Sequence, residues 1–201
     1  MNRYALTFTV RPGSVAEVAE ILAGYSSPPP GRSGPARPLL DRTSVFMAGP
    51  VVVRIVDITC PPEQAIRHLV GQPQIRAAEE RLRPHLTEDR DLSDDRSRRR
   101  FLATSVMRVV SSENGHGGRL SRAATLYEAL PGRGGEVARV LAAGGSPAGC
   151  GTTVFRRRDL VVHLLESPDP MMEAPPVSSA PLVRPARPMT PVTDRVAGVM
   201  V

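Results

Sequence analysis

The chain contains one sequence pattern twice. PGSVAEVAEILAGYSSP at residues 12–28 matches PGRGGEVARVLAAGGSP at 131–147, and TSVFMAGPVVVRIVD at 43–57 aligns without a gap with TTVFRRRDLVVHLLE at 152–166. Two copies are too few, and their period is too long, for a solenoid of stacked repeats. The sequence therefore predicts two small domains that share one fold.

Strand and helix patterns predict an α+β fold for the first copy, residues 1–112. Alternating or β-branched runs predict the strands, and apolar residues at spacings of three and four predict the helices. The predicted elements are strands at 4–10, 40–47, 51–58 and 101–111, and helices at 15–23, 61–69 and 73–82. This is the ferredoxin-like order β-α-β-β-α-β. Ser14 and Glu17 have the spacing of a capping box at the first helix.

The second copy, residues 119–166, is shorter than the first. It predicts strands at 123–130, 151–155 and 160–166 and a helix at 135–143. The prolines of 167–188 exclude a long helix, so the stretch 167–201 is expected to be an extended or disordered tail. Residues 189–194 loosely repeat the last strand of the first copy and predict a remnant of that strand.

Two further stretches are predicted to lie outside regular structure. Residues 26–38 contain five prolines and predict an exposed loop. Residues 87–100 consist almost entirely of charged and polar side chains and predict a linker or a solvated loop.

Composition excludes several classes of function. The chain has no lysine, so its 26 basic residues are all arginine, which excludes a Schiff-base lysine and the lysine of a phosphate-binding P-loop. The arginine runs lack interleaved aromatic residues, so no nucleic-acid partner is predicted despite the net charge of +6. The turn 132–135 lacks the third glycine of a dinucleotide fingerprint.

Neither a metal nor a membrane partner is predicted. The four histidines have no HxH or HExxH spacing, and the two cysteines lie in different copies without a CxxC motif. No apolar stretch reaches 18 residues, and the N-terminus is too short and polar for a signal peptide. We expect a cytoplasmic protein without cofactor.

Arg54 and His163 are the first candidates for a functional site. Both occupy the same position in strands that are almost continuously apolar, 51–58 and 160–166. A buried arginine needs an anion, a hydrogen-bonding network or a solvated cavity. Either Arg54 pairs with an acid and His163 is a satisfied core histidine, or both line a pocket between sheet and helices. In the second case Arg54 would hold an oxyanion and His163 would move protons.

Five other side chains are candidates for substrate binding. Asp57 and Glu166 match each other in the two copies, three residues after Arg54 and His163. Arg42 begins the strand that precedes Arg54. Tyr4 and Tyr127 lie on the first strand of each copy.

The residues that carry the repeat also resemble a known family. YALTFTVRPGSVAEVAEIL, LLDRTSVFMAGPVVVRIVD and the following PPEQAIRHL are similar to the SchA/CurD-like proteins encoded among aromatic polyketide and spore-pigment biosynthesis genes. The resemblance covers about residues 1–166. It implies a ferredoxin-like, dimeric alpha-beta barrel type of architecture, related to the antibiotic-biosynthesis monooxygenases and polyketide cyclases. Such monooxygenases act on polyphenols without flavin or metal.

The resemblance implies a tailoring enzyme of aromatic (type II) polyketide biosynthesis. We expect a cofactor-independent monooxygenase that forms a quinone from an anthrone, with His163 as base and Arg54 as oxyanion partner. A deprotonated polyphenol is reducing enough to react with oxygen itself, so the protein need supply only a base, an anion-binding group and a dry pocket.

Two alternatives remain open at this point. One is a polyketide cyclase or aromatase, and the other is a non-catalytic partner of the cyclases or synthase. A monomer with an internal pseudo-dimer is expected, and a homodimer stays open.

Overall fold

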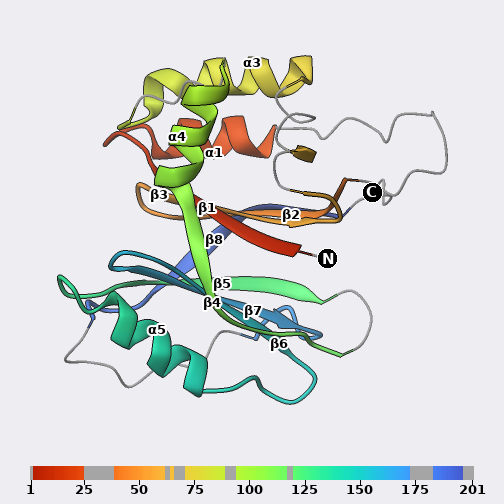
Figure 1. The fold of residues 1–201 in the computed structure, drawn as a ribbon, viewed down its shortest axis with the longest axis vertical. Helices are drawn as coiled ribbons and strands as arrows, with labels where there is room; N and C mark the ends of the chain where they lie inside the picture. Colours follow the sequence, from red (N-terminus) through yellow and green to blue (C-terminus); the bar gives the residue numbers. More distant parts are fainter. Residues whose placement is uncertain are drawn as a thin grey trace. The chain divides into compact units, whose positions relative to one another are not determined.

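A computed structural model describes residues 2–24, 39–61, 64–65, 71–88, 94–116, 120–172 and 183–196 (Figure 1). The fold is α+β, as predicted, and the eight strands of the described residues follow the hydrogen-bonded order β1-β3-β2-β8-β5-β7-β6-β4 of a closed barrel. The chain divides into two compact units. One comprises Met1–Val106 with Val192–Val201, and the other comprises Met107–Pro191.

The first unit is a sheet covered by helices. Its elements are β1 Asn2–Thr9, α1 Val15–Ala23, β2 Leu40–Ala48, β3 Val51–Ile58, α3 Pro73–Leu82, the 3-10 helix η1 Arg83–His85 and α4 Asp95–Ser105. Strands β1 and β2 both pair antiparallel with the central strand β3. Val18 and Leu22 of α1 and Leu82 of α3 pack with Val45 and Val52 of the sheet in one buried cluster. Burying each such side chain contributes about 1.5–3 kcal/mol.

The second unit has the same central arrangement. Its elements are β4 Val106–Glu113, β5 Ser121–Glu128, α5 Gly134–Ala143, β6 Gly151–Arg157, β7 Leu160–Ser167 and the first part of β8 Arg187–Val196. Strands β5 and β6 flank the central strand β7. Val137, Ala138 and Leu141 of α5 pack on Tyr127 and Val161 of this sheet.

Each unit includes all or part of the last strand of the other copy. Strand β4 ends the first copy but pairs with β6 in the second unit. Strand β8 ends the second copy, pairs with β5 through Ala124 and Met189, and contributes Val192 onwards to the first unit. The units therefore divide near Val106 and Pro191. The domain boundaries predicted at 112 and 119 follow sequence similarity, and they remain a prediction about the repeats.

Most predicted elements occur in the structure with ends shifted by a few residues. The helix at 73–82 is found with the predicted limits, and residues 189–194 lie within strand β8. That they are a remnant of the repeat's last strand stays a prediction. Of the predicted helix 61–69, Gln64 and Ala65 are helical. The rest of this predicted helix, apart from Pro61, lies outside the described residues. The same is true of the predicted loop 26–38 and of two segments of the predicted tail, 173–182 and 197–201. The ferredoxin-like character of each repeat remains an interpretation.

The predicted loop at 87–100 and strand at 101–111 are wrong over residues 95–105, which form helix α4. Asp94 caps this helix, because its carboxylate accepts hydrogen bonds from the backbone amides of Arg96 (2.7 Å) and Ser97 (3.0 Å). An N-cap of this kind typically contributes about 1 kcal/mol. The cap and the helix-favouring arginines outweigh the charge density that suggested a loop, so the strand begins only at Val106.

The predicted capping box at Ser14 and Glu17 is also wrong. Ser14 makes no side-chain cap, and its hydroxyl instead lies 3.1 Å from Nδ1 of His85. Nε2 of the same histidine lies 3.6 Å from the Glu17 carboxylate. Both polar side chains at the start of α1 are thus used in a contact with η1, which a local sequence motif does not reveal.

The glycine-rich turn before α5 is filled by a carboxylate of the protein itself. Asp159, in the turn between β6 and β7, accepts hydrogen bonds from the amides of Gly132 and Gly134, both at 3.0 Å. A Cβ on Gly134 would lie 2.1 Å from the carbonyl oxygen of Arg158, so glycine is required there for this close approach. The turn therefore starts a helix, in agreement with the sequence interpretation.

We expect Asp159→Asn to destabilise the protein at neutral pH. The two amide hydrogen bonds hold the pKa of Asp159 below its ordinary value. Because the folded-state pKa is the lower one, the stabilisation is present above the unfolded value of about 3.9 and is lost as the pH falls through the folded value. Urea unfolding of wild type and variant between pH 2 and 7 measures this. The difference should disappear at the acid end, and Glu113→Gln at an exposed position of β4 is the control that should change little.

Candidate functional site

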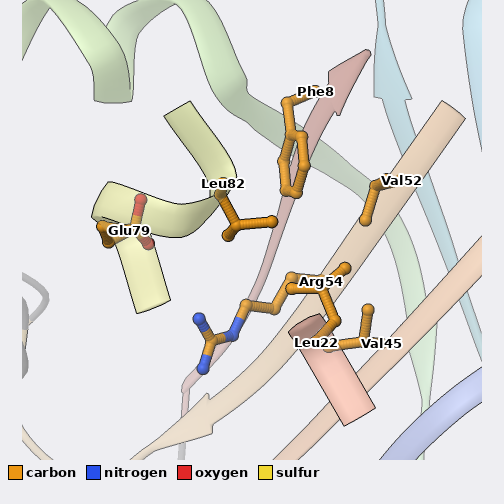
Figure 2. Close-up of a pocket in the computed structure, with 7 residues that line it drawn as sticks. All are labelled: Phe8, Leu22, Val45, Val52, Arg54, Glu79 and Leu82. Carbon is orange, nitrogen blue, oxygen red and sulfur yellow. The ribbon is translucent and has the colours of Figure 1, made fainter. Parts of the chain in front are cut away.

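A pocket in the first unit lies between the sheet and helices α1 and α3 (Figure 2). Five apolar side chains and two charged ones line it: Phe8, Leu22, Val45, Val52 and Leu82, with Arg54 and Glu79. Its cavity volume is about 10 Å³, which is roughly the space for one water molecule. An organic ligand therefore needs the covering side chains to move.

Arg54 reaches this pocket from the central strand. It lies on β3 opposite Val45 of β2, two residues after Val52, so it shares the sheet face that α1 and α3 cover. In Figure 2 its side chain extends from β3 toward α3. The location is the one expected for Arg54 in the pocket hypothesis, and its catalytic role remains a prediction.

Glu79 is a pocket residue that the sequence interpretation missed. It lies on α3, one turn before the buried Leu82 and one turn after the buried Ile75. Residues at these spacings share one helix face. A glutamate between two core positions on that face was the available signal. Glu79 brings a proton acceptor to the otherwise apolar pocket, and Arg54 brings a permanent positive charge.

The second copy has a matching set of residues at the same place. The repeat aligns the sheet and α1 residues of the pocket, in order Phe8, Leu22, Val45, Val52 and Arg54, with Tyr127, Leu141, Val154, Val161 and His163. The first four of these counterparts belong to one buried cluster beneath α5. Val183 packs against this cluster and bridges Ala129, as Leu86 bridges Val10 in the first copy. The described residues after β7 include no helix equivalent to α3.

His163 and Tyr127 are buried polar groups on one face of this second sheet. They are 3% and 1% exposed. Within the described part of the chain, neither His163 nitrogen nor the Tyr127 hydroxyl has a hydrogen-bond partner. Burial lowers the pKa of His163 and raises that of Tyr127, which favours a neutral ring and a protonated phenol. The role of His163, as a core histidine or as a pocket residue, stays a prediction.

Asp57 and Glu166 are held in equivalent ion pairs. Arg3 Nε lies 2.7 Å from Asp57 Oδ1, and Arg122 Nε lies 2.9 Å from Glu166 Oε1. In each pair the two residues face each other on neighbouring strands. Arg3 and Arg122 also correspond in the repeat, which a comparison starting at Pro12 overlooks. The two carboxylates therefore link neighbouring strands through ion pairs. Substrate binding by them stays a prediction.

Arg42 and Tyr4 do not line the pocket. Arg42 donates hydrogen bonds from Nε (2.9 Å) and Nη2 (2.6 Å) to the carboxylate of Asp194 on β8. Ser44 donates a further hydrogen bond to that carboxylate at 2.8 Å. Tyr4 is partly buried on β1. Neither is among the residues that line the pocket, so their predicted role in substrate binding gains no support from it.

Neither a metal-binding cluster nor a membrane-spanning helix is found in the part of the chain that the structure describes. No group of three or more His, Cys, Asp or Glu side chains there could hold a metal ion. No helix there is long and apolar enough to cross a membrane.

Fold and site together define an α+β protein whose first unit carries a helix-covered, largely apolar pocket with a guanidinium and a carboxylate in its wall. The chain belongs to the SchA/CurD-like domain family, whose sequence model matches residues 1–114. That match contains the complete set of residues that line the pocket of the first unit.

Three curated proteins of Streptomyces are similar to most of the chain. Polyketide synthase CurD of Streptomyces cyaneus is 43% identical over 187 residues, which cover 86% of this chain and 50% of that protein. The 42.8 kDa protein in the whiE locus of Streptomyces coelicolor is 43% identical over 183 residues, covering 86% and 46%. Protein SchA of Streptomyces halstedii is 41% identical over 184 residues, covering 86% and 48%. The chain thus spans about half the length of the curated relatives it matches.

Solved structures are more distant. A Fusobacterium nucleatum protein described provisionally as a monooxygenase has a TM-score of 0.47 at 8% identity, covering 98% of this chain and 95% of that one. An anthrone oxidase-like protein has a TM-score of 0.41 at 11% identity, covering 98% and 93%.

Proposed function

We propose that the protein is a tailoring enzyme of aromatic polyketide biosynthesis that converts an anthrone to a quinone with molecular oxygen and without a cofactor. Membership of the SchA/CurD-like family and the similarity to polyketide synthase CurD of Streptomyces cyaneus support the substrate class. The observation that carries the chemistry is the pair Arg54 and Glu79 in the wall of an apolar pocket. The substrate is a small aromatic polyketide.

In this proposal the first step is removal of a proton from the anthrone. The Glu79 carboxylate accepts the proton, and the Arg54 guanidinium binds the oxyanion that forms as the ring carbonyl becomes an enolate. The apolar walls keep water out, which strengthens the attraction between Arg54 and the oxyanion. The enolate then reduces oxygen. One oxygen atom replaces the two hydrogens of the methylene carbon, and the other leaves as water.

Substrate entry requires the pocket to open. Pockets for molecules of this size are typically about 300 Å³ or larger, whereas the closed pocket has a cavity of about 10 Å³. Glu79 and Leu82 both belong to α3, which covers one side of the pocket, whereas the opposite wall belongs to the sheet. We therefore propose that α3 moves away from β3 when substrate binds.

The test is turnover of 1,8-dihydroxyanthrone by the purified, metal-free protein, in air and under nitrogen, followed by liquid chromatography with mass detection. We expect the quinone, in which one oxygen replaces two hydrogens, to form faster than in protein-free buffer only in air. No acceleration in either atmosphere would refute the oxygenase. Ring closure of a poly-β-ketone without oxygen would then indicate a cyclase, and copurification with a synthase without turnover would indicate a non-catalytic partner.

A further inference from the structure

We propose that the second unit has its own ligand site, in which His163 and Tyr127 bind an uncharged hydroxylated aromatic compound. The proposal rests on the proposed function only for the ligand class. The site lies on the α5-facing side of the sheet formed by β5, β7 and β6. It is separate from the pocket of Arg54 and Glu79, which belongs to the first unit.

The first argument is the equivalence of the two places. Each of the five pocket residues from the sheet and α1 has a counterpart in the second copy, and the three aliphatic ones are retained as Leu141, Val154 and Val161. The other two positions have changed in chemistry. A phenol replaces the ring of Phe8, and an imidazole replaces the guanidinium of Arg54.

The second argument is that both new polar groups are buried in an apolar cluster. Tyr127 pairs with Val161 across the sheet and His163 with Thr125, so the two are diagonal neighbours on one face. Within the described residues their polar atoms have no hydrogen-bond partner. Leaving buried donors and acceptors unpaired is costly, and groups of this kind in a folded protein call for a specific explanation.

The third argument concerns charge. The ionised groups of this sheet nearest in sequence to His163, Glu166 and its partner Arg122, form a buried ion pair of their own. Arg156 shares the α5-facing side of the sheet but is exposed, and its Nη1 lies against Gly135 at the start of α5. The buried cluster itself offers a phenol donor and an imidazole that can accept a hydrogen bond. This suits a neutral ligand with both a carbonyl and a phenol, such as a hydroxylated quinone, better than an anion.

The two places differ in the segment that covers them, and this difference indicates where a ligand enters the second site. In the first copy Glu79 and Leu82 of α3 close the pocket. In the second copy Val183 packs against the cluster, and no described helix takes the place of α3. We infer that a ligand enters beside Val183.

The test uses the full chain labelled with ¹⁵N-histidine and titrated with 1,8-dihydroxyanthraquinone, a stable quinone probe. The chain has four histidines, and His163→Gln identifies the signal of His163 by its disappearance. We expect the probe to shift that signal in a saturable manner. Tyr127→Phe keeps the ring and removes the hydroxyl, and should weaken binding at this site about threefold to tenfold.

The outcome that overturns the proposal is an unchanged His163 signal at probe concentrations that saturate other sites, which would mean that the two groups bind only internal water. Equal affinity in Tyr127→Phe would also overturn it. The same titration in the Arg54→Met, Glu79→Gln double variant separates this proposal from the proposed function. The His163 shift should persist there even if the first pocket has no part in catalysis.

Discussion

Replacing Glu79 with Gln should reduce kcat/KM for 1,8-dihydroxyanthrone in air by about a hundredfold or more, the usual contribution of a general base. The amide has almost the same shape as the carboxylate but cannot accept the proton. Because Glu79 lies at the pocket wall on α3 and is only partly buried, the substitution should leave the fold intact. The loss should therefore appear with an unchanged unfolding midpoint.

Arg54→Met should lower the same quantity by about a hundredfold to a thousandfold, the cost measured for loss of one oxyanion-stabilising group. Methionine keeps most of the apolar stem that packs beside Val52 and removes the charge. If Arg54 acts on the oxyanion formed during reaction, kcat falls more than KM rises. A rise in KM alone would mean that Arg54 only binds substrate.

Glu80→Gln is the matched control for both variants. Glu80 lies beside Glu79 on α3 but is exposed and does not line the pocket. Turnover should stay within about twofold of wild type, because exposed charges of this kind contribute little. Equal losses in Glu79→Gln and Glu80→Gln would show that the charge of α3 matters and would contradict a specific base.

The central strands of the sheets were predictable from the sequence, because the apolar runs at 51–58 and 160–166 have lengths and compositions typical of buried strands. They form β3 and β7, the central strands of the two units. The exchange of β4 and β8 between the units was not predictable. Pairing partners far apart in sequence are chosen by packing, which leaves no local pattern in either strand.

The candidate site was predictable only in part. Arg54 and His163 stood out because a polar residue interrupts an apolar strand, and the structure places both on the helix-covered side of their sheets. Glu79 was overlooked because a glutamate in a charged helix carries no such contrast. Asp57 and Glu166 were singled out for binding, but their partners Arg3 and Arg122 lie before the recognised repeat, so their ion pairs were not foreseen.

The buried pair of Arg122 and Glu166 should give the largest effect on stability. Glu166→Leu is expected to lower the free energy of unfolding by about 3–5 kcal/mol, because the guanidinium then loses its carboxylate in a buried position. The side chains of Arg122 and Glu166 are only 1% and 9% exposed. Urea unfolding followed by circular dichroism measures the change.

A second variant distinguishes a buried charge from lost packing. In the double variant Arg122→Met, Glu166→Leu no charge remains to be desolvated, and two apolar side chains of similar volume fill the same space. Replacing both members of a buried pair is often neutral or stabilising, so most of the loss in Glu166→Leu should be recovered. Arg98→Gln breaks a pair whose Asp95 is 83% exposed and should cost less than about 1 kcal/mol. A double variant as unstable as Glu166→Leu would show instead that the shape of the pair holds β5 against β7, and that its charge matters little.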